Sequence, residues 1–276
     1  MMTKILVSLI AILWVGSSEK KEIINACNFA GSTKTKHVVS GQAVVGLDNW
    51  FNHERDKTGK IYHYTWNDTL NSGFSQLGDI FKERNAILKT IQKPIPERLS
   101  KLDIYIIVDP DTTSENPNPN YISSDDISSI KNWVNNGGVL LLMANDGPNC
   151  EFTHLNRLAE VFGFQFVPVT LNPVTNHQWE MAAETNLPNH PLFKGVHKIY
   201  MKEVSPILIS KDAKVVLEDG DNILMAESLY GKGKVLAIGD PWLYNEYIGN
   251  SRLPKSFENM KAANNLVDYL LKEAKN

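Results

Sequence analysis

The stretch that decides the fold runs from Leu102 to Asp146 and has three pieces: LDIYIIVD (102–109), SSDDISSIKNWVNNGG (123–138) and VLLLMAND (139–146). The first and last pieces are apolar runs that end in acidic residues, as expected of strands buried on both faces. The middle piece starts with the Ser and Asp typical of a helix N-cap, has apolar residues at helical spacing, and ends in two glycines. This order of strand, helix and strand predicts a parallel sheet with helices on both faces.

Similar signals extend this pattern along the chain in both directions. We expect strands at 43–47, 104–108, 139–143, 164–169, 215–217, 223–229 and 234–238, and helices at 74–84, 123–136, 151–162 and 256–273. Gly231-Lys232-Gly233 is expected to be a turn between the last two strands, whereas 168–206 shows no regular period. The expected fold is a three-layer, doubly wound α/β domain. It has a mostly parallel sheet, a C-terminal β-hairpin and a final helix.

The composition excludes several classes of protein. With 276 residues, of which 42% are hydrophobic and 21% charged, the chain has enough length and apolar surface to bury a core. Its 28 basic and 31 acidic residues lack the basic excess of a dominant nucleic-acid or anionic-membrane footprint. Two cysteines exclude a four-cysteine metal site. The phosphate-loop and dinucleotide glycine motifs are absent, so we expect neither nucleic acid nor nucleotide as a partner.

The N-terminus has the pattern of an export signal. A positive charge at Lys4 precedes an apolar run at 5–15, and the small residues Gly16-Ser17-Ser18 follow. About 11 apolar residues span about 16 Å as a helix, too short for a bilayer core of about 30 Å. We expect a signal peptide at 1–18, a polar segment at 19–40 and a single α/β domain at 41–276. The protein is then secreted, into the periplasm, with no membrane contact after cleavage. The alternative is a buried N-terminal strand or helix.

Acidic side chains follow four of the expected strands. In open α/β sheets, ligands bind at the carboxyl ends of the strands, so these side chains are expected to share one crevice. The candidate catalytic residues are Asp48, Asp109, Asp146 and Asp240. A pair of them on opposite sides of a glycosidic bond would supply a general acid and a general base. Because Asp also suits turns, each one taken alone is more often a loop former.

Aromatic and polar side chains accompany these carboxylates. Flat rings stack on the C–H face of a sugar, and amides hydrogen-bond its hydroxyls. The predicted substrate-binding residues are Asn49, Trp50, Trp66, Asn149, His154 and Trp242. An oligosaccharide is therefore the expected partner, while the alternative is that the rings pack as a plug over the sheet edge. No cofactor and no metal ligand is assigned. A divalent cation held by Asp109, Asp111, Asp146 or Asp240 is a weaker alternative.

The stretch from Leu102 to Phe166 resembles the class I glutamine amidotransferase-like superfamily. In addition, NHPLFKGV (189–196) and GKGKVLAIGDPWLYN (231–245) resemble a bacterial branch of unknown function within it. The resemblance implies a flavodoxin-like, Rossmann-like α/β fold. It does not extend to glutaminase activity, because the position of the nucleophile elbow has Ala144-Asn145-Asp146-Gly147, and His190 is followed by Pro-Leu where the family has x-Glu. Cys150 with His154 as its base remains an alternative, and a structural thiol is the simpler interpretation.

Two further segments, VVGLDNWFNHE (44–54) and HYTWNDTLNSGFSQLGDIF (63–81), resemble modules that accompany unsaturated glucuronyl and rhamnogalacturonyl hydrolases of polysaccharide-degrading bacteria. This resemblance implies plant-type oligosaccharides as ligands and a companion glycoside hydrolase as a partner. Two functions stay open. The protein binds or hydrolyses such oligosaccharides, or it is a non-catalytic interaction domain whose loops form a partner surface.

Overall fold

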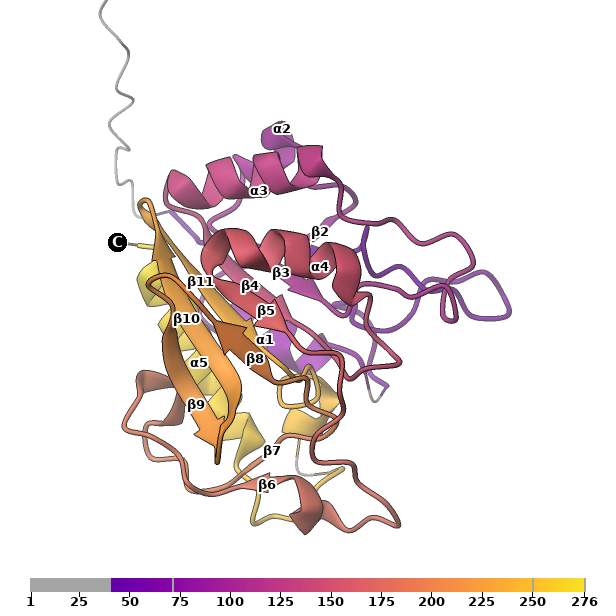
Figure 1. The fold of residues 1–276 in the computed structure, drawn as a ribbon, viewed down its shortest axis with the longest axis vertical. Coiled ribbons are helices and arrows are strands. Elements are labelled where there is room, and N and C mark those ends of the chain that lie inside the picture. Colours follow the sequence, from indigo (N-terminus) through magenta and orange to yellow (C-terminus); the bar gives the residue numbers. More distant parts are fainter. Residues whose placement is uncertain (1–40, 71, 250, 276) are drawn as a thin grey trace, which may run out of the picture. The chain divides into compact units, whose positions relative to one another are not determined.

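The computed structural model describes residues 41–70, 72–249 and 251–275. The expected signal peptide (1–18) and polar segment (19–40) lie outside these residues, as does Cys27, which is the other of the two cysteines besides Cys150. The main sheet has seven strands in the order β2-β1-β3-β4-β11-β10-β9, shown in Figure 1. The strands from β2 to β11 in this order pair in parallel, whereas β10 pairs antiparallel with both β11 and β9. This arrangement confirms the predicted α/β fold with a mostly parallel sheet, C-terminal antiparallel strands and a final helix.

The elements of the main sheet and its helices follow the chain in alternation. The strands are β1 (Val44–Asp48), β2 (Ile87–Ile91), β3 (Ile104–Val108), β4 (Val139–Met143), β9 (Lys214–Asp219), β10 (Asn222–Tyr230) and β11 (Gly233–Ile238). The helices are α1 (Ser75–Glu83), α2 (Pro96–Leu99), α3 (Ser124–Asn135), α4 (Phe152–Ala159) and α5 (Asn259–Glu273). Two small antiparallel sheets pair β5 (Phe164–Phe166) with β8 (Ile207–Ile209) and β6 (Ala183–Glu184) with β7 (Ile199–Tyr200). Short 3₁₀ turns are η1 (Glu160–Phe162), η2 (Trp179–Ala182), η3 (Pro191–Phe193) and η4 (Glu246–Ile248).

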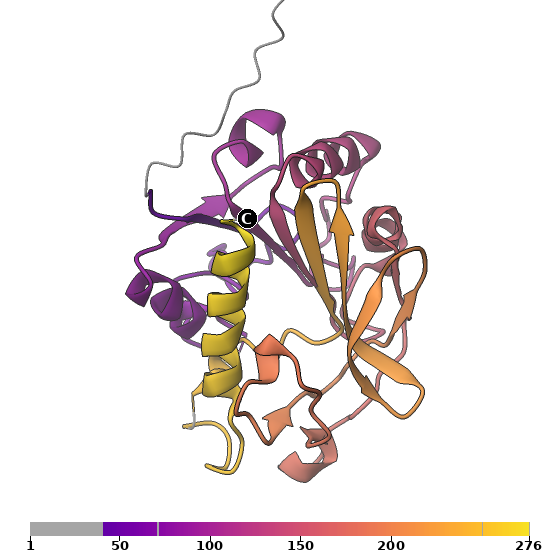
Figure 2. The ribbon, with the colours of Figure 1, turned by 90° about the vertical axis from the view of Figure 1, so that its left-hand side faces the viewer.

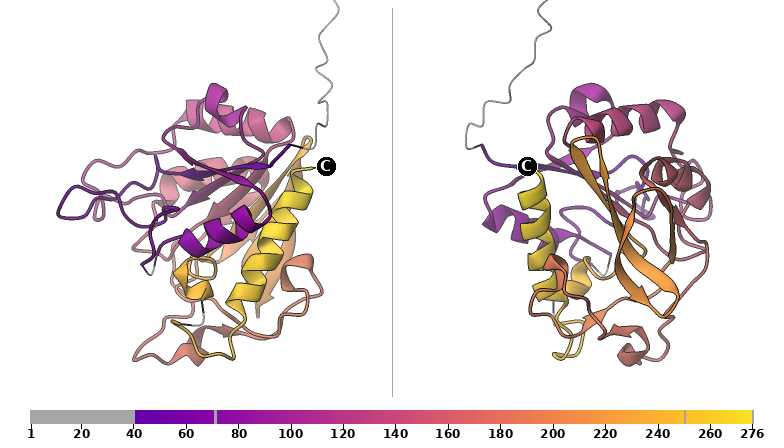
Figure 3. Two further views of the ribbon diagram at one scale, coloured as in Figure 1. Left: turned by 180° about the vertical axis from the view of Figure 1, so that it is seen from behind. Right: turned by 60° about the vertical axis from the view of Figure 1, so that its left-hand side comes forward.

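The sheet is covered on both faces, as Figures 2 and 3 show. Helices α1 and α5 pack on one face together with Ile104, Ile106 and Val108 of β3. Helices α3 and α4 pack on the other face, which receives Tyr105 and Ile107 of the same strand. Because successive side chains of a strand point to opposite faces, a strand covered on both faces needs an unbroken apolar run.

Helix α2 and the short strands β6, β7 and β8 were not expected, and three further details differ from the sequence-based expectation. Strand β2 was not expected, because as an edge strand it exposes most of its side chains and has no apolar run. The strand expected at 164–169 is only β5, and it pairs with β8 outside the main sheet. The helix expected at 151–162 is α4 followed by the separate turn η1.

The loop that follows β11 is attached to the first turn of α1. Glu246 Oε1 accepts hydrogen bonds from Ser75 Oγ (2.6 Å) and from the backbone N–H of Gln76 (3.1 Å), and its Oε2 accepts from Gln76 Nε2 (2.5 Å). A carboxylate at a helix N-terminus satisfies free N–H groups there and interacts favourably with the helix dipole. None of the helices among the described residues combines the length and hydropathy of a membrane span.

Candidate functional site

The sheet brings the four predicted aspartates to one edge. Asp48 is the last residue of β1, and Asp109, Asp146 and Asp240 follow β3, β4 and β11. These four strands are neighbours and run parallel, so their carboxyl ends meet at the same edge. All four side chains are buried, with no more than 5% of any residue exposed. An acid or base that acts on a glycosidic bond must contact it directly, so the burial of these four carboxyls limits their access to such a bond.

Asp48 holds the loop after β1 in place. Its Oδ2 accepts hydrogen bonds from the backbone N–H groups of Trp50 (3.1 Å) and Phe51 (2.8 Å), and its Oδ1 accepts from the Tyr105 hydroxyl (2.5 Å). Burial raises the pKa of Asp48 to about 7, against the lowering effect of these donors. The carboxyl is fully engaged within the protein, so its role is to shape the loop.

Asp109 is a buried and strained residue. Its φ of 45° lies in the left-handed region that non-glycine residues rarely adopt. Its Oδ2 accepts a hydrogen bond from Asn145 Nδ2 (3.0 Å), while its Oδ1 has no partner. Burial raises the pKa of Asp109 well above its ordinary value, and the nearby charge of Glu115 raises it further. The raised pKa favours the protonated form of Asp109.

Asp240 is fully buried at the end of β11. Its Oδ1 accepts a hydrogen bond from the Trp242 backbone N–H (2.5 Å), and its Oδ2 has no partner of good geometry. Burial raises the pKa of Asp240 well above its ordinary value, and the charge of Lys202 lowers it only in part. The raised pKa favours the protonated form of this carboxyl, which can donate a hydrogen bond.

Asp146 links the end of β4 to a neighbouring segment. Its Oδ1 accepts from Asn149 Nδ2 (2.6 Å) and its Oδ2 from Thr170 Oγ1 (2.8 Å). Asn149, predicted to bind substrate, uses its amide in this contact. The other predicted amide, Asn49, donates to the Asn52 carbonyl (3.3 Å) and accepts from Gln92 (3.1 Å). Both amides thus support loops in this structure.

The predicted aromatic residues separate into buried and accessible ones. Trp66 is 8% exposed and lies in the core against α1, with its indole N–H donating to the Lys89 carbonyl (3.0 Å), so it does not present a face for stacking. Trp50 is partly exposed beside Lys93. His154, in the first turn of α4, stacks on Tyr121 with the ring centroids 4.6 Å apart. Trp242 is partly exposed and lies at the end of β11.

Trp242 belongs to a group of four rings, Trp179, Tyr200, Trp242 and Tyr247, that we call the aromatic cluster. The Tyr247 ring is its centre, at 5.2 Å from Trp242, 5.8 Å from Tyr200 and 6.4 Å from Trp179. Trp179, Trp242 and Tyr247 are partly exposed, whereas Tyr200 is buried. Lys202 Nζ lies 3.7 Å from the centre of the Trp242 ring and pairs with Glu203 at 2.7 Å.

A second group of charged side chains lies over β1 and β3. Its carboxyls are Glu54, Asp109, Asp111 and Glu115, which we call the acidic cluster. His63 Nδ1 lies 2.9 Å from Glu54 Oε1, and His53 Nδ1 lies 3.3 Å from Asp111 Oδ2. Burial raises the pKa of both Asp111 and Glu115. Tyr64 lies beside this cluster, and burial raises the pKa of its hydroxyl well above its ordinary value, with further contributions from Asp109 and Glu54.

Buried polar atoms without hydrogen-bond partners gather at this edge of the sheet. Within the described residues they include Asn52 Oδ1, Asp109 Oδ1, Tyr200 OH, Asp240 Oδ2, Trp242 Nε1, Tyr244 OH and Asn245 Nδ2. Most buried polar groups in proteins are paired, because an unpaired one costs about 1–3 kcal/mol. Donors and acceptors are mixed here, which suits a ligand that offers several hydroxyl groups.

Two other sequence-based alternatives can be compared with the structure. Burial raises the pKa of the Cys150 thiol well above its ordinary value, and the charge of Asp109 adds to this, which disfavours the thiolate that a nucleophile needs. Across residues 41–70, 72–249 and 251–275, no group of three or more His, Cys, Asp or Glu side chains has an arrangement that could hold a metal ion. Asp109, Asp111, Asp146 and Asp240 therefore do not form the carboxylate cage considered above.

Sequence reasoning missed three of the four rings of the aromatic cluster. Trp179 and Tyr200 come from the segment at 168–206, where no periodicity identifies the inward positions. Tyr247 comes seven residues after Asp240, in the short turn η4, where no strand or helix periodicity predicts which side chains point inward. The one usable signal was the density of aromatic residues just after β11, Trp242, Tyr244 and Tyr247, next to a strand end that was already predicted.

Comparisons with known proteins support the fold. A family model described as a domain of unknown function, DUF4350, matches residues 67–251. The N-terminal domain of mmIFT52 is similar with a TM-score of 0.63 and 16% identity, over 83% of this chain and 97% of that one. Two cytoplasmic proteins of Salmonella typhimurium are also similar. STM1381 has a TM-score of 0.54 and 15% identity over 83% and 99% of the two chains, and STM3548 has 0.51 and 17% over 82% and 98%. No curated protein matches the sequence.

Proposed function

Because the chain belongs to the DUF4350 family, a domain family of unknown function, we propose a function from its own site: it binds an oligosaccharide at the carboxyl ends of β3, β4 and β11 and does not cleave it. At these identities the similar structures inform the fold alone. The proposal therefore rests on the side chains at the strand ends.

The observation that carries the proposal is the set of unpartnered buried polar atoms beside the partly exposed aromatic cluster. Asp240 Oδ2, Trp242 Nε1 and Asn245 Nδ2 come from one loop and combine a carboxyl, an indole N–H and an amide. A sugar ring has an apolar C–H face and a rim of hydroxyls that both donate and accept. The aromatic rings match the face and the polar atoms match the rim.

The protonation and the hydrogen bonds of the carboxyl groups favour binding over hydrolysis. A retaining or inverting hydrolase needs an ionised carboxylate as nucleophile or base besides the protonated acid. Asp109 and Asp240 have strongly raised pKa values, and both carboxyl oxygens of Asp48 and of Asp146 accept hydrogen bonds from the protein. A neutral Asp240 would instead donate a hydrogen bond to a sugar hydroxyl.

The place of action in this proposal is the periplasm. The export signal expected at 1–18 would deliver the domain to the compartment where plant-type oligosaccharides enter the cell. The domain would there hold the oligosaccharide for a companion glycoside hydrolase that cuts it.

The test is titration calorimetry of the chain without residues 1–18 against neutral and acidic plant-type oligosaccharides. We expect one class to bind, and Trp242→Ala and Tyr247→Ala to weaken that binding about tenfold, equivalent to about 1.4 kcal/mol. Tyr121→Ala is the matched control, because Tyr121 is an exposed ring outside the aromatic cluster. If the whole panel gives no heat and no thermal shift with folded protein, the binding proposal is wrong.

Asp240→Asn separates binding from catalysis. The amide keeps the size of the neutral acid, so binding should change only a few-fold. If the wild type released reducing sugar and Asp240→Asn did not, Asp240 would be a catalytic acid. That result would refute the non-catalytic part of the proposal.

A second candidate is an interaction domain, favoured by exposed apolar side chains in the segment that contributes Trp179. Val169 and Met181 are 44% and 43% exposed there. In that case a pull-down with the wild type should recover a protein that Met181→Asp loses, and the oligosaccharide panel should give no binding.

A further inference from the structure

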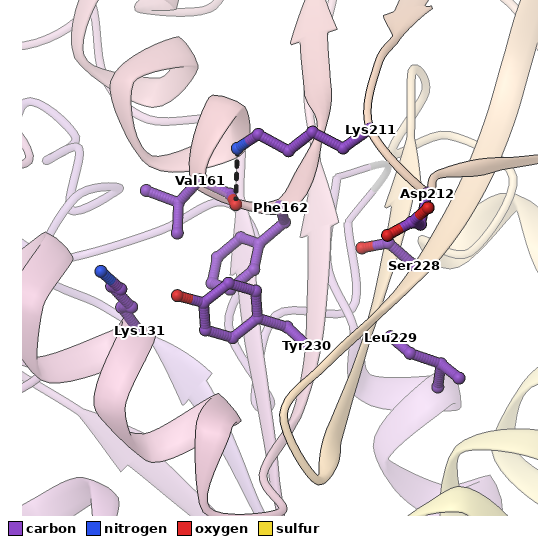
Figure 4. A pocket seen from close by; sticks show the side chains of 8 residues that line it. All are labelled: Lys131, Val161, Phe162, Lys211, Asp212, Ser228, Leu229 and Tyr230. Atoms are coloured by element: carbon purple, nitrogen blue, oxygen red, sulfur yellow. Dashed lines mark hydrogen bonds between the residues drawn. The ribbon is translucent and has the colours of Figure 1, made fainter.

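A cavity of about 400 Å³ lies between α3, η1 and β10 (Figure 4). Tyr230, which lines it, pairs with Gly233 at the start of β11, whereas Asp240 follows the end of that strand. The cavity is therefore at the opposite end of β11 from the oligosaccharide site. Its volume falls within the range of about 300–1,000 Å³ that is usual for small-molecule sites.

One end of the cavity carries an uncompensated positive charge. Lys131 of α3 is exposed and forms no ion pair within the described residues. Lys211 is held at the rim, where its Nζ donates to the carbonyls of Glu160 (2.6 Å) and Val161 (3.0 Å). In Figure 4, Lys131 lies on one side of the Tyr230 ring, and Asp212 lies on the other side with Ser228. The lining thus carries two positive charges, at Lys131 and Lys211, and one negative charge at Asp212, which lies on the side of Ser228.

The other end contains an unpartnered hydroxyl. Ser228 is 6% exposed, and its Oγ has no hydrogen-bond partner. Ser228 and Tyr230 are two residues apart on β10 and point to the same face of the sheet. Figure 4 shows both on the cavity side of the strand. A buried hydroxyl that is left unpaired costs free energy, so Ser228 favours a ligand with a polar group at that position.

The walls between these ends are apolar. The ring of Tyr230 stands edge-on to that of Phe162, with the centroids 5.2 Å apart, and the Val161 side chain lies beside them. Tyr230 and Val161 are partly exposed, so they offer a ring face and an aliphatic surface to a flat ligand.

We infer that this cavity binds a small hydroxylated aromatic carboxylate. The carboxylate lies at Lys131, the ring packs against Tyr230 and Val161, and the ligand hydroxyl bonds with Ser228 Oγ. Asp212 fixes the orientation, because it repels a carboxylate at the Ser228 end and attracts a hydroxyl donor.

The inference is tested by titration calorimetry with three probes: 4-hydroxybenzoate, its neutral amide 4-hydroxybenzamide, and benzoate, which lacks the hydroxyl. We expect 4-hydroxybenzoate to bind at least tenfold more tightly than either analogue. Lys131→Met should remove the preference for the carboxylate over the amide, and Ser228→Ala should remove the preference for the hydroxylated ring.

The matched control is Lys101→Met, because Lys101 is an exposed lysine away from the cavity lining. Unchanged circular dichroism and melting temperatures would show that the variants are folded. Equal binding of the three probes, no binding of any of them, or a charge preference that survives Lys131→Met would overturn the inference. Because the cavity shares no residue with the aromatic cluster, these outcomes are independent of the oligosaccharide titrations.

Discussion

Replacing Asp48 by Asn should reduce the loss of folding stability that accompanies rising pH. Asp48 has a pKa of about 7 in the folded chain, against 3.8 as its ordinary value. A raised folded pKa means that the folded state holds the proton more tightly, so its contribution to stability is complete below pH 3.8 and is lost as the pH rises through 7. Between pH 5 and pH 8 about two pKa units of this effect are lost, or about 3 kcal/mol at about 1.4 kcal/mol per unit.

The Asp48→Asn variant would keep the shape of the protonated acid without its titration. The new amide carbonyl can still accept from the backbone N–H groups of Trp50 and Phe51, and the amide nitrogen can face the Tyr105 oxygen. In urea titrations followed by tryptophan fluorescence at pH 5, 6, 7 and 8, we expect wild type to lose about 3 kcal/mol more than Asp48→Asn. The reasoning is refuted if the two free energies of unfolding fall in parallel across this range.

Glu227 provides a control of opposite sign. Burial raises the pKa of Glu227, but the nearby His190, the Tyr269 hydroxyl that donates to its Oε2 and the Lys234 ammonium outweigh burial and hold the pKa at about 2, below the ordinary 4.5. Its stabilising effect is present above pH 4.5 and is lost as the pH falls toward 2. Glu227→Gln should therefore leave the slope between pH 5 and pH 8 unchanged and should reduce the loss of stability in acid.

Three further outcomes follow from packing. Gly233→Ala should destabilise the fold by about 3 kcal/mol in urea titrations, because a Cβ there would lie 2.1 Å from the Val134 carbonyl oxygen, and a variant as stable as wild type would contradict the geometry. Trp66→Ala should cost about 3–5 kcal/mol and leave the affinity for oligosaccharides unchanged, since its ring is in the core; a selective loss of binding would return Trp66 to the site. In a Cys27→Ser background, iodoacetamide should modify Cys150 of the folded protein at least about 100-fold more slowly than in urea, and equal rates would exclude a buried thiol.

The central strands could be predicted because they are buried on both faces. β3 and β4 have five consecutive buried residues each, which produces the apolar runs at 104–108 and 139–143. β2 has the same length but only Ile91 is buried, so the chain offered no such run. The strand expected at 164–169 was placed in the wrong sheet, because a local pattern does not specify the partner of a strand.

The candidate site was predictable to the extent that it depends on the ends of strands. All four aspartates were located from this rule, and their common edge follows from the parallel order of β1, β3, β4 and β11. Their burial was not predictable, since it is produced by loops that close over the edge. Trp66 illustrates the same limit, because an aromatic residue in a loop has the same local pattern whether it packs inward or faces solvent.

The attachment of Glu246 to the first turn of α1 has a consequence for the speed of ligand capture. The loop with Trp242 and Asn245 is held at one end by Asp240 and at the other by Ser75 and Gln76. A ligand would meet a surface that is already ordered, so little conformational entropy is lost on contact. Association should then be a single kinetic phase whose rate rises in proportion to ligand concentration, without the plateau that a slow closing step imposes.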